Sequence, residues 1–261
     1  MRRNRPGRRA SRALRALRKA PPAVRAAIAV AALVIASFAV NWVYQVVRKP
    51  AELFFPVSGA LSKTPEETWR SYAAIFREHA TAVITPDFLA ALAQIEGAGN
   101  PVAQTYWRWR LTAEPFEVYR PASSAVGMYQ ITDGTFRQAK RYCIHDHVVV
   151  EDGAWYEPGS CWFNSLYLRV VPSNAVEMTS ALLDRQVSRV LARQSIAGAT
   201  LQQKQDLAAV IHLCGVAKGA AYARHKFRLR AGERCGDHDP ARYLGRVNAM
   251  KRAFFRLAKT R

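Results

Sequence analysis

Hydrophobic residues recur every three or four positions along much of the chain, which predicts a mainly α-helical protein. The pattern is clearest in the stretch 84–97, where the regularly spaced apolar residues are Phe88, Leu89, Leu92 and Ile95. We expect a helix with one apolar face there. Thr85-Pro86 marks its start, because proline at the first helical position lacks only an N–H that would have no partner. Gly97 and Gly99 mark its end.

Capping patterns predict the starts of further helices. In a capping box, a side chain at the helix start and a Glu or Gln three residues later satisfy each other's free backbone donors. The matching pairs are Thr64 with Glu67, Asn174 with Glu177, and Thr200 with Gln203. Asp239-Pro240 begins the last helix, and Asp133 is expected to cap the helix that contains Phe136.

Charge divides the N-terminal region. Residues 1–25 hold nine arginines and Lys19 with no acidic residue, so they supply half of the net charge of +20. Residues 26–47 are uncharged, and this run is long enough to cross a hydrocarbon core about 30 Å thick. Trp42 and Tyr44 suit the aromatic belt of a membrane interface. The expected organisation is a basic cytoplasmic tail 1–25, a transmembrane signal anchor 26–47, a juxtamembrane linker 48–63 and a domain 64–261.

Two other interpretations of this region exist. A signal peptide could be cleaved after the small-residue segment Ser37-Phe38-Ala39, but a retained anchor is favoured because apolar residues continue through Val47. The basic tail could be a nucleic-acid-binding arm. Positive charge on the cytoplasmic side of a membrane span already accounts for it, so no nucleic-acid partner is expected.

Four cysteines indicate disulfides if the domain lies on the oxidising side of a membrane. They are Cys143, Cys161, Cys214 and Cys235. Three pairings are open, and the local one would join each cysteine to its nearest neighbour. The segment 144–160 between the first two predicts a small β-hairpin. His145, His147 and Asp237 lie near cysteines, but the tight spacing of a zinc module is missing, so no metal is expected.

Glu96 is the strongest candidate for catalysis from the residues alone. It falls at the edge of the apolar face, at the C-terminal end of the helix before Gly97. Desolvation and the negative end of the helix dipole would favour the protonated carboxyl, as a general acid requires near neutral pH. The alternative is an ordinary solvated glutamate at a helix end.

The downstream residues carry a resemblance. The segment 123–132, with Gly127, Met128, Gln130 and Ile131, resembles the Gly-Leu-Met-Gln-Ile signature of the soluble lytic transglycosylase family. In that family the signature follows a catalytic Glu-Ser in a lysozyme-like fold, and Glu96 with Asn100-Pro101 is similar to this first motif. The resemblance covers roughly residues 84–250.

The resemblance implies particular roles. Glu96 would protonate the leaving oxygen and then act as a base on the C6 hydroxyl of N-acetylmuramic acid, closing a 1,6-anhydro ring without water or a cofactor. Gly127 and Met128 would shape the floor of the cleft, and Tyr129 and Gln130 would offer hydrogen bonds to the substrate or to Glu96. Tyr243 resembles the family's closing tyrosine, which reaches toward the active site.

The chain also departs from the family pattern. Gly97 stands where the family has serine, and Tyr129 stands in place of methionine before the glutamine. His212 and Leu213 replace the tyrosine and asparagine of a Tyr-Asn-Ala-Gly motif. His212 is either a substrate contact or a core histidine.

The segment 106–120 between the two motifs is rich in aromatic and basic residues. It would either form one wall of a glycan groove or brace a longer loop as an aromatic mini-core. Asp133 is a candidate for the second carboxylate that hydrolysis usually requires, although capping is the preferred interpretation. A hydrolytic muramidase and a non-catalytic wall-binding module of an envelope-spanning machine therefore remain alternatives.

These observations together predict a mainly α, lysozyme-like domain with a small β-hairpin and loop insertion, preceded by one transmembrane helix. We expect it in the bacterial inner membrane with its N-terminus cytoplasmic and its catalytic domain in the periplasm. The expected partner is the glycan strand of peptidoglycan, whose carboxylates suit a basic protein.

Overall fold

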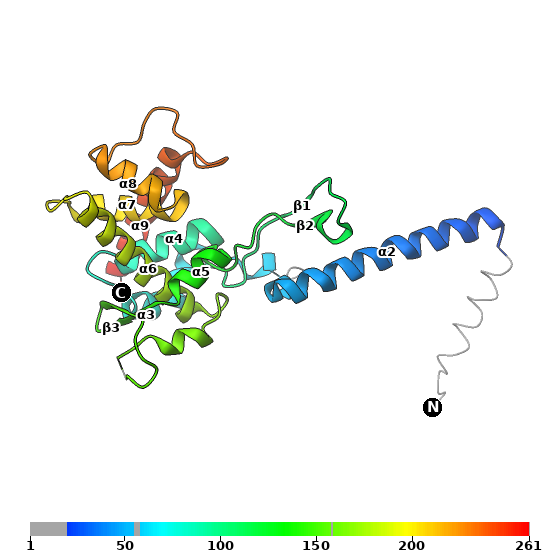
Figure 1. Cartoon of the computed structure of the whole chain (residues 1–261), viewed down its shortest axis with the longest axis horizontal. Coiled ribbons are helices and arrows are strands. Elements are labelled where there is room, and N and C mark those ends of the chain that lie inside the picture. Colours follow the sequence, from blue (N-terminus) through cyan, green and yellow to red (C-terminus); the bar gives the residue numbers. More distant parts are fainter. Residues whose placement is uncertain (1–19, 55–57, 158, 261) are drawn as a thin grey trace. The chain divides into compact units, whose positions relative to one another are not determined.

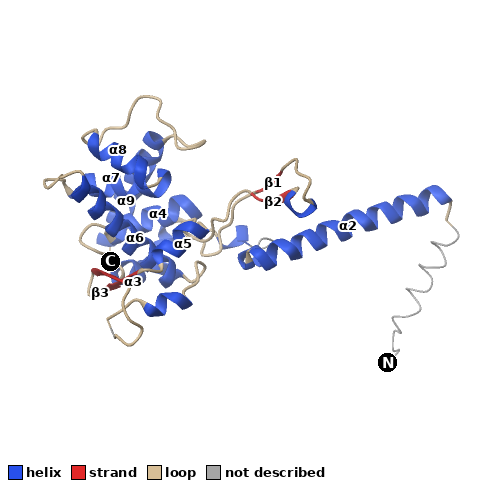
Figure 2. Ribbon diagram, in the orientation of Figure 1, coloured by secondary structure: helices blue, strands red, loops and turns tan. Residues whose placement is uncertain are grey.

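A computed structural model describes residues 20–54, 58–157 and 159–260 (Figures 1 and 2). The described residues form eight α-helices and two small two-stranded sheets, so the predicted mainly α class is confirmed. They divide into two compact units. The first holds the described residues up to Pro50 together with Arg108–Arg120, and the second holds Ala51–Trp107 and the chain from Pro121 onward. Residues 1–19, most of the predicted tail, lie outside the described residues.

The first unit contains a long apolar helix, α2 (Pro22–Arg48). It includes all of the predicted span 26–47 and begins four residues earlier, with proline at its first position. Among the described residues it is the one helix long and apolar enough to cross a membrane. A signal sequence near an N-terminus has the same properties, so α2 is either a span or a signal.

The remainder of the first unit is Arg108–Arg120, which we call the clasp. It contains the 3-10 turn η3 (Pro115–Glu117). It also contains the last two residues of strand β1 (Trp107–Trp109) and the first two residues of strand β2 (Tyr119–Pro121), and these two strands pair with each other. The sequence predicted a groove wall or an aromatic mini-core for this segment. The structure groups it with α2, and the rings of Trp109 and Tyr119 within it pack with centroids 4.6 Å apart, in agreement with the aromatic mini-core.

The second unit is built from seven helices and the other small sheet. Its α-helices are α3 (Pro65–Glu78), α4 (Pro86–Gly97), α5 (Asp133–Ala139), α6 (Pro172–Arg193), α7 (Leu201–Cys214), α8 (Val216–Arg224) and α9 (Pro240–Lys259). Its shorter elements are η1 (Pro50–Phe54), η2 (Ser58–Leu61), η4 (Trp162–Leu166), β3 (Tyr142–His145) and β4 (Val148–Glu151). Helices α3, α4, α6, α7 and α9 contribute most of one continuous hydrophobic core.

Helix α4 is buried on every side. The five consecutive residues Leu89–Ala93 are completely inaccessible to solvent, whereas the sequence predicted a helix with one apolar face. Three of the five are alanines, and these small side chains allow neighbouring helices to approach the backbone closely. Helices α3 and α9 both pack against α4. Glu96, in the last turn of this helix, is therefore held by a fully buried part of the core.

Two of the predicted capping boxes are confirmed. Thr64 accepts a hydrogen bond from the backbone N–H of Glu67, whose carboxylate accepts one from the N–H of Thr64. The same reciprocal pair joins Thr200 and Gln203. Asp239 caps α9 by accepting from two backbone N–H groups.

Two predicted caps were wrong. Helix α6 begins at Pro172, so Asn174 lies inside its first turn and does not cap it. Glu177 is buried and accepts hydrogen bonds from the Ile144 N–H and the Tyr167 hydroxyl instead. At α5 the cap is Thr132, one residue before the predicted Asp133. Local spacing could not identify these alternatives, because the partners of Glu177 come from other elements.

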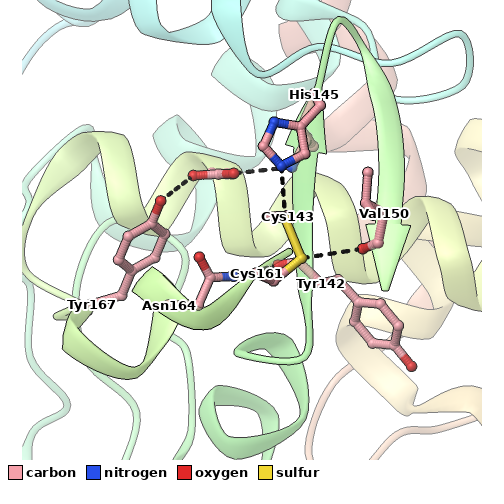
Figure 3. Close-up of a disulfide and its surroundings, with 9 residues drawn as sticks. Tyr142, Cys143, His145, Val150, Cys161, Asn164 and Tyr167 are labelled. Atoms are coloured by element: carbon pink, nitrogen blue, oxygen red, sulfur yellow. Dashed lines mark hydrogen bonds between the residues drawn. A yellow bond between two sulfur atoms is a disulfide. The ribbon is translucent and has the colours of Figure 1, made fainter. Parts of the chain in front are cut away.

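The predicted hairpin after Cys143 is present and begins slightly earlier. Strands β3 and β4 pair antiparallel, with Tyr142 opposite Glu151 and His145 opposite Val148. The Cys143–Cys161 disulfide ties this hairpin to the loop that follows it. Figure 3 shows this disulfide close to His145 and to the carbonyl of Val150. Of the three possible pairings, the structure has the local one.

The second disulfide joins Cys214, at the end of α7, to Cys235, in the loop before α9. All four cysteines are therefore bonded. Disulfides persist in oxidising compartments. Together with the apolar helix α2, they indicate that the second unit lies outside the cytoplasm.

Candidate functional site

A groove of about 470 Å³ lies in the second unit, and Glu96 is on its wall. This volume is within the range of small-ligand sites. Its lining comes from the end of α4, the 130–132 turn, and helices α5, α6 and α7. Glu96 is the one carboxylate among the described residues that line it.

The local sequence explains why Glu96 stands where it does. Helix α4 ends at Gly97, and Ala98 and Gly99 follow with φ of 49° and 62°, in the left-handed region that ends helices. The side chain of Glu96 is 17% exposed. The carboxyl thus lies at the boundary between the core and the groove, as the sequence predicted.

The carboxyl of Glu96 is also bound by Tyr243, in helix α9. Its hydroxyl donates a hydrogen bond of 2.5 Å to Oε1 of Glu96. Burial raises the pKa of Tyr243 well above its usual value, and the negative charge and hydrogen bond of Glu96 add to the shift. The phenol therefore remains a donor at any physiological pH. The sequence prediction that Tyr243 reaches the site agrees with this geometry.

His212 also approaches Glu96. Its Nε2 lies 3.8 Å from Oε1, too far for a hydrogen bond but close enough to interact through charge if the ring is protonated. The ring is mostly buried and lines the groove together with its neighbour Leu213. The structure thus brings His212 to the site.

The segment 127–130 forms the turn expected from the second motif. Gly127 has φ of 82°, and a Cβ there would lie 2.6 Å from the backbone oxygen of Arg169, so only glycine fits. Gln130 also has a positive φ, and its amide donates to the carbonyls of Ala103 and Gly127. Gln130 lines the groove, but its side-chain amide N–H groups are engaged by backbone carbonyls of its own turn and of Ala103.

Tyr129 is not a substrate contact in this structure. The side chain is completely buried, and its hydroxyl donates to the carbonyl of Leu89 in α4. Burial raises its pKa well above the usual value. Met128 is also completely buried and does not line the groove. The turn directs both side chains into the core, so the predicted cleft floor at Met128 and the predicted hydrogen bond from Tyr129 to the substrate or to Glu96 are not seen in this structure.

The backbone at Met128 closes the space beside Gly97. A Cβ added to Gly97 would lie 2.8 Å from Cα of Met128 and 3.1 Å from the carbonyl oxygens of Gly127 and Met128. These are backbone atoms, so they have little freedom to move away. A serine at position 97 would therefore be crowded by the turn that packs against the end of α4.

The remaining groove lining is mostly apolar, with five neutral polar residues able to form hydrogen bonds among the described residues. These polar residues, which the sequence analysis missed, are Thr132, Thr135, Gln138, Thr179 and Gln186. They come from α5, α6 and the turn before α5. The sequence signal that could have identified them is the helical spacing of these polar residues, which places them on one face of each helix. Oγ1 of Thr179 is buried and has no hydrogen-bond partner among the described residues.

Two other predicted features lie away from the groove lining. Asp133 pairs with Arg169 at 2.8 Å, and its side chain is 54% exposed. None of the described residues that line the groove comes from the segment 106–120. Within the described residues, no group of three or more His, Cys, Asp or Glu is placed to hold a metal ion.

When compared with models of known protein families and with curated proteins, the sequence matches none of them.

Proposed function

We propose that the second unit is a peptidoglycan lytic transglycosylase with a lysozyme-like fold. It cleaves the β-1,4 bond between N-acetylmuramic acid and N-acetylglucosamine and leaves 1,6-anhydro ends. The observation that carries the proposal is the position of Glu96. It is the one carboxylate among the described groove-lining residues, it is mostly buried, and Tyr243 binds it directly.

The chemistry of the groove supports a sugar substrate. Neutral glutamine and threonine side chains can pair with the hydroxyl and acetamido groups of a glycan. Ile131, Leu182 and Val216 add apolar surface for the faces of the rings. A phosphate ligand would instead call for arginines or a glycine-rich cradle in the lining, and the described lining has neither.

Charge near the groove favours a substrate that carries carboxylates. A second cavity of about 290 Å³ shares His238 with the groove, and Tyr243 also lines it. Three arginines, Arg234, Arg242 and Arg246, contribute to its wall. Arginine pairs well with carboxylates, which muramic acid and its stem peptides supply.

The proposed reaction uses Glu96 twice. The protonated carboxyl first gives its proton to the glycosidic oxygen, the bond from that oxygen to C1 of N-acetylmuramic acid breaks, and the N-acetylglucosamine end leaves as an alcohol. The C6 hydroxyl then attacks C1, and the carboxylate takes the proton from that hydroxyl. The carboxyl is protonated again at the end, so no water is consumed.

Tyr243 is the positioning residue in this scheme. Its hydrogen bond holds Oε1, so Oε2 is the atom left to exchange protons with the sugar. Fixing the orientation of an acid relative to its substrate is worth one or more orders of magnitude in rate.

Hydrolysis is less well supported. A water-using glycosidase usually has a second carboxylate to activate water or attack the sugar. Asp133 is the candidate from the sequence, but it pairs with Arg169 and is not part of the groove lining. The arrangement therefore favours the mechanism in which the substrate supplies the nucleophile.

The proposed location follows from the same reaction. Peptidoglycan lies outside the inner membrane of bacteria, so the domain would face the periplasm. The Arg-rich N-terminus would stay in the cytoplasm, with α2 crossing the inner membrane once.

Digestion of purified peptidoglycan, followed by mass analysis of the fragments, tests the proposal. We expect anhydro ends from the parent protein and none from Glu96→Gln, whose folding is checked by its melting temperature. Asp133→Asn is the matched control and should release anhydro fragments at nearly the parental rate. Hydrated reducing ends that disappear in Asp133→Asn would establish a muramidase instead. Binding without release would establish a non-catalytic module.

A further inference from the structure

The clasp, Arg108–Arg120, is the most unusual feature of the chain that the proposed reaction does not use. We propose that the clasp is a fixed partner of helix α2 and lies in the headgroup layer of the bilayer that α2 crosses. The helix is then a retained part of the folded protein and not a removable signal. This inference concerns the first unit alone and does not depend on the reaction of the second.

The clasp accepts hydrogen bonds from two polar side chains of the apolar helix. Asn41 Nδ2 donates to the carbonyl of Tyr119, and Gln45 Nε2 donates to the carbonyl of Phe116, both at 2.7 Å. These are the two residues of α2 that are buried, at 8% and 5% exposure. An amide N–H facing lipid without a partner would be costly, and these two bonds lower that cost, while Oδ1 of Asn41 is buried without a partner among the described residues.

Charge fixes the end of the helix to the clasp. Glu117 pairs with Arg48 of α2 at 2.5 Å and with Arg120 of the clasp at 2.6 Å. Its side chain is only 14% exposed, so the two arginines largely enclose it. A carboxylate held by two arginines fixes the orientation better than a single exposed pair.

Aromatic rings make the remaining contacts. Phe38 of α2 meets both Trp109 and Tyr119 edge to face, with centroids about 6 Å apart. Tyr44 stacks on Phe116 at 4.7 Å. Such pairs add to the stability that their buried area alone provides.

The contacts follow one face of the helix. Ser37, Asn41, Gln45 and Arg48 are spaced by three or four residues, which places them on one side of α2. The cavity between helix and clasp extends this face back to Leu33. Cleavage after Ala39 would cut through the middle of this contact face. A signal peptide that is cleaved off would not be expected to supply contact residues for the mature protein. The contacts between α2 and the clasp therefore favour a helix that is retained.

The charged residues of the clasp indicate how deeply it lies in the membrane. Charged groups such as Arg110 and Glu117 are strongly disfavoured in hydrocarbon, so the clasp belongs at the membrane surface. The helix ahead of Asn41, from Pro22 to Val40, is about 28 Å long at 1.5 Å per residue, close to the thickness of the hydrocarbon core. Asn41 and the turns after it then stand in the headgroup layer beside the clasp, and Phe38, with Trp109 and Tyr119 against it, lies at the boundary between this layer and the hydrocarbon core.

The outer surface of the clasp suits that layer. Trp109, between Arg108 and Arg110, is 65% exposed, and Leu111, which follows Arg110, is fully exposed. Tryptophan is enriched where apolar and polar zones meet, and arginines interact favourably with anionic headgroups. The lipid headgroup region is therefore the occupant that this surface fits.

The full-length chain, reconstituted in vesicles of phosphatidylethanolamine and phosphatidylglycerol, tests the depth. A bimane fluorophore is attached at Leu111→Cys or, for comparison, at Leu33→Cys in the middle of the helix. We expect a nitroxide near the headgroups to quench position 111 several-fold more than a nitroxide at the bilayer centre, with the opposite order at position 33. Absence of quenching at 111 by either lipid would overturn the lipid contact.

Two further measurements test the helix contact. The mass of the protein isolated from membranes should include residues 1–39, and a mature chain that starts at Val40 would overturn retention. Trypsin should cut at Arg108 and Arg110 several-fold faster in Asn41→Leu/Gln45→Leu, because the clasp loses its hydrogen bonds. Val43→Leu/Val47→Leu, on exposed positions of the same helix, is the matched control. Equal cutting in both variants would overturn the proposed role of the clasp.

Discussion

Tyr243 and Glu96 are 147 residues apart in sequence, and a hydrogen bond of 2.5 Å joins the hydroxyl of one to Oε1 of the other. The bond connects the first turn of α9 to the last turn of α4. These two helices pack against each other along the centre of the second unit. The position of the proposed acid is therefore set by core packing and not by a mobile loop.

Replacing Tyr243 with phenylalanine removes this bond and leaves the ring in the core. We expect kcat on peptidoglycan to fall about ten- to a hundredfold with little change in KM, because the carboxyl loses its fixed orientation. Stability should fall by about 1.5–3 kcal/mol, the usual contribution of a hydrogen bond to a charged group. Steady-state kinetics and thermal unfolding measure the two effects.

Tyr222→Phe is the control for that change. Tyr222 is also buried, and burial together with the negative charge of Asp206 raises its pKa to about 12. It does not line the groove. Its replacement should leave kcat at the parental value. An equal loss of kcat in both variants would show that the effect at Tyr243 is one of packing alone.

Gly97→Ser restores the residue that the lytic transglycosylase pattern has at this position. The new Cβ would lie 2.8 Å from Cα of Met128, so the turn or the helix end must shift. We expect a loss of about 1–3 kcal/mol, as for other overpacked sites, and reduced cleavage. Gly134→Ala, where nothing lies within 4 Å of the new Cβ, should retain parental stability or gain slightly. A more active and equally stable Gly97→Ser protein would contradict the packing explanation.

Tyr129→Phe separates a core role from a substrate role. The lost hydroxyl donates to the Leu89 carbonyl in a fully buried site, so unfolding should become easier by about 1–3 kcal/mol. KM and kcat should both stay at parental values at a temperature where the variant is folded. A raised KM would instead indicate that the hydroxyl of Tyr129 contacts the substrate.

The two disulfides should differ in their effect on activity. The linked cysteines are 18 and 21 residues apart, and each bond should contribute about 3 kcal/mol by restricting the unfolded chain. Cys214 and Cys235 are close in sequence to the groove residues Leu213, Gly215 and His238. Replacing that pair by serines should therefore reduce both melting temperature and cleavage. Replacing Cys143 and Cys161 should mainly reduce the melting temperature.

Stability should fall in acid partly through the cap of α3. Hydrogen bonds from the backbone and side chain of Thr64 lower the pKa of Glu67 below its ordinary value of about 4.3. Because the pKa of Glu67 is lower in the folded state than in the unfolded chain, its contribution to stability is complete above the unfolded-state pKa. That contribution is lost as the pH falls through the folded-state pKa. Melting temperatures of Glu67→Gln between about pH 5 and 3 should therefore change less than those of the parent.

Glu66→Gln is the matched control for the acid experiment. Glu66 is exposed in the same first turn, so the same charge is lost near the start of the helix, but the capping box is intact. Its pH profile should be parallel to that of the parent. If Glu67→Gln and Glu66→Gln give the same profile, the capping box is not the source of the effect.

Local signals predicted much of the second unit. The start and end of α4 and the boxes at Thr64 and Thr200 depend on residues within four positions of each other, so they are visible in the sequence. The approach of Tyr243 to Glu96 was expected only from the resemblance, because nothing local connects residues so far apart. The partners of Glu177 and the inward direction of Tyr129 depend on tertiary packing and were missed.

The clasp was missed for a different reason. Its aromatic and basic residues suit a glycan groove and a membrane interface equally well, and its position in the chain, between the two motifs, favoured the groove. The informative signal was elsewhere, in Asn41 and Gln45. Two amides four residues apart in an apolar run share one helix face and require partners in lipid.

For the glycan-cleaving function proposed above, the closure of the space at Gly97 restricts how the groove could acquire a new sugar preference. Beside Glu96, at position 97, any side chain larger than hydrogen meets the main chain of the 127–128 turn, so variation there is excluded by geometry. The part of the groove wall at His212 and Leu213 consists of side chains that could be exchanged without moving the main chain. Under the proposed function, adaptation to a different glycan would therefore be expected to change that part of the wall.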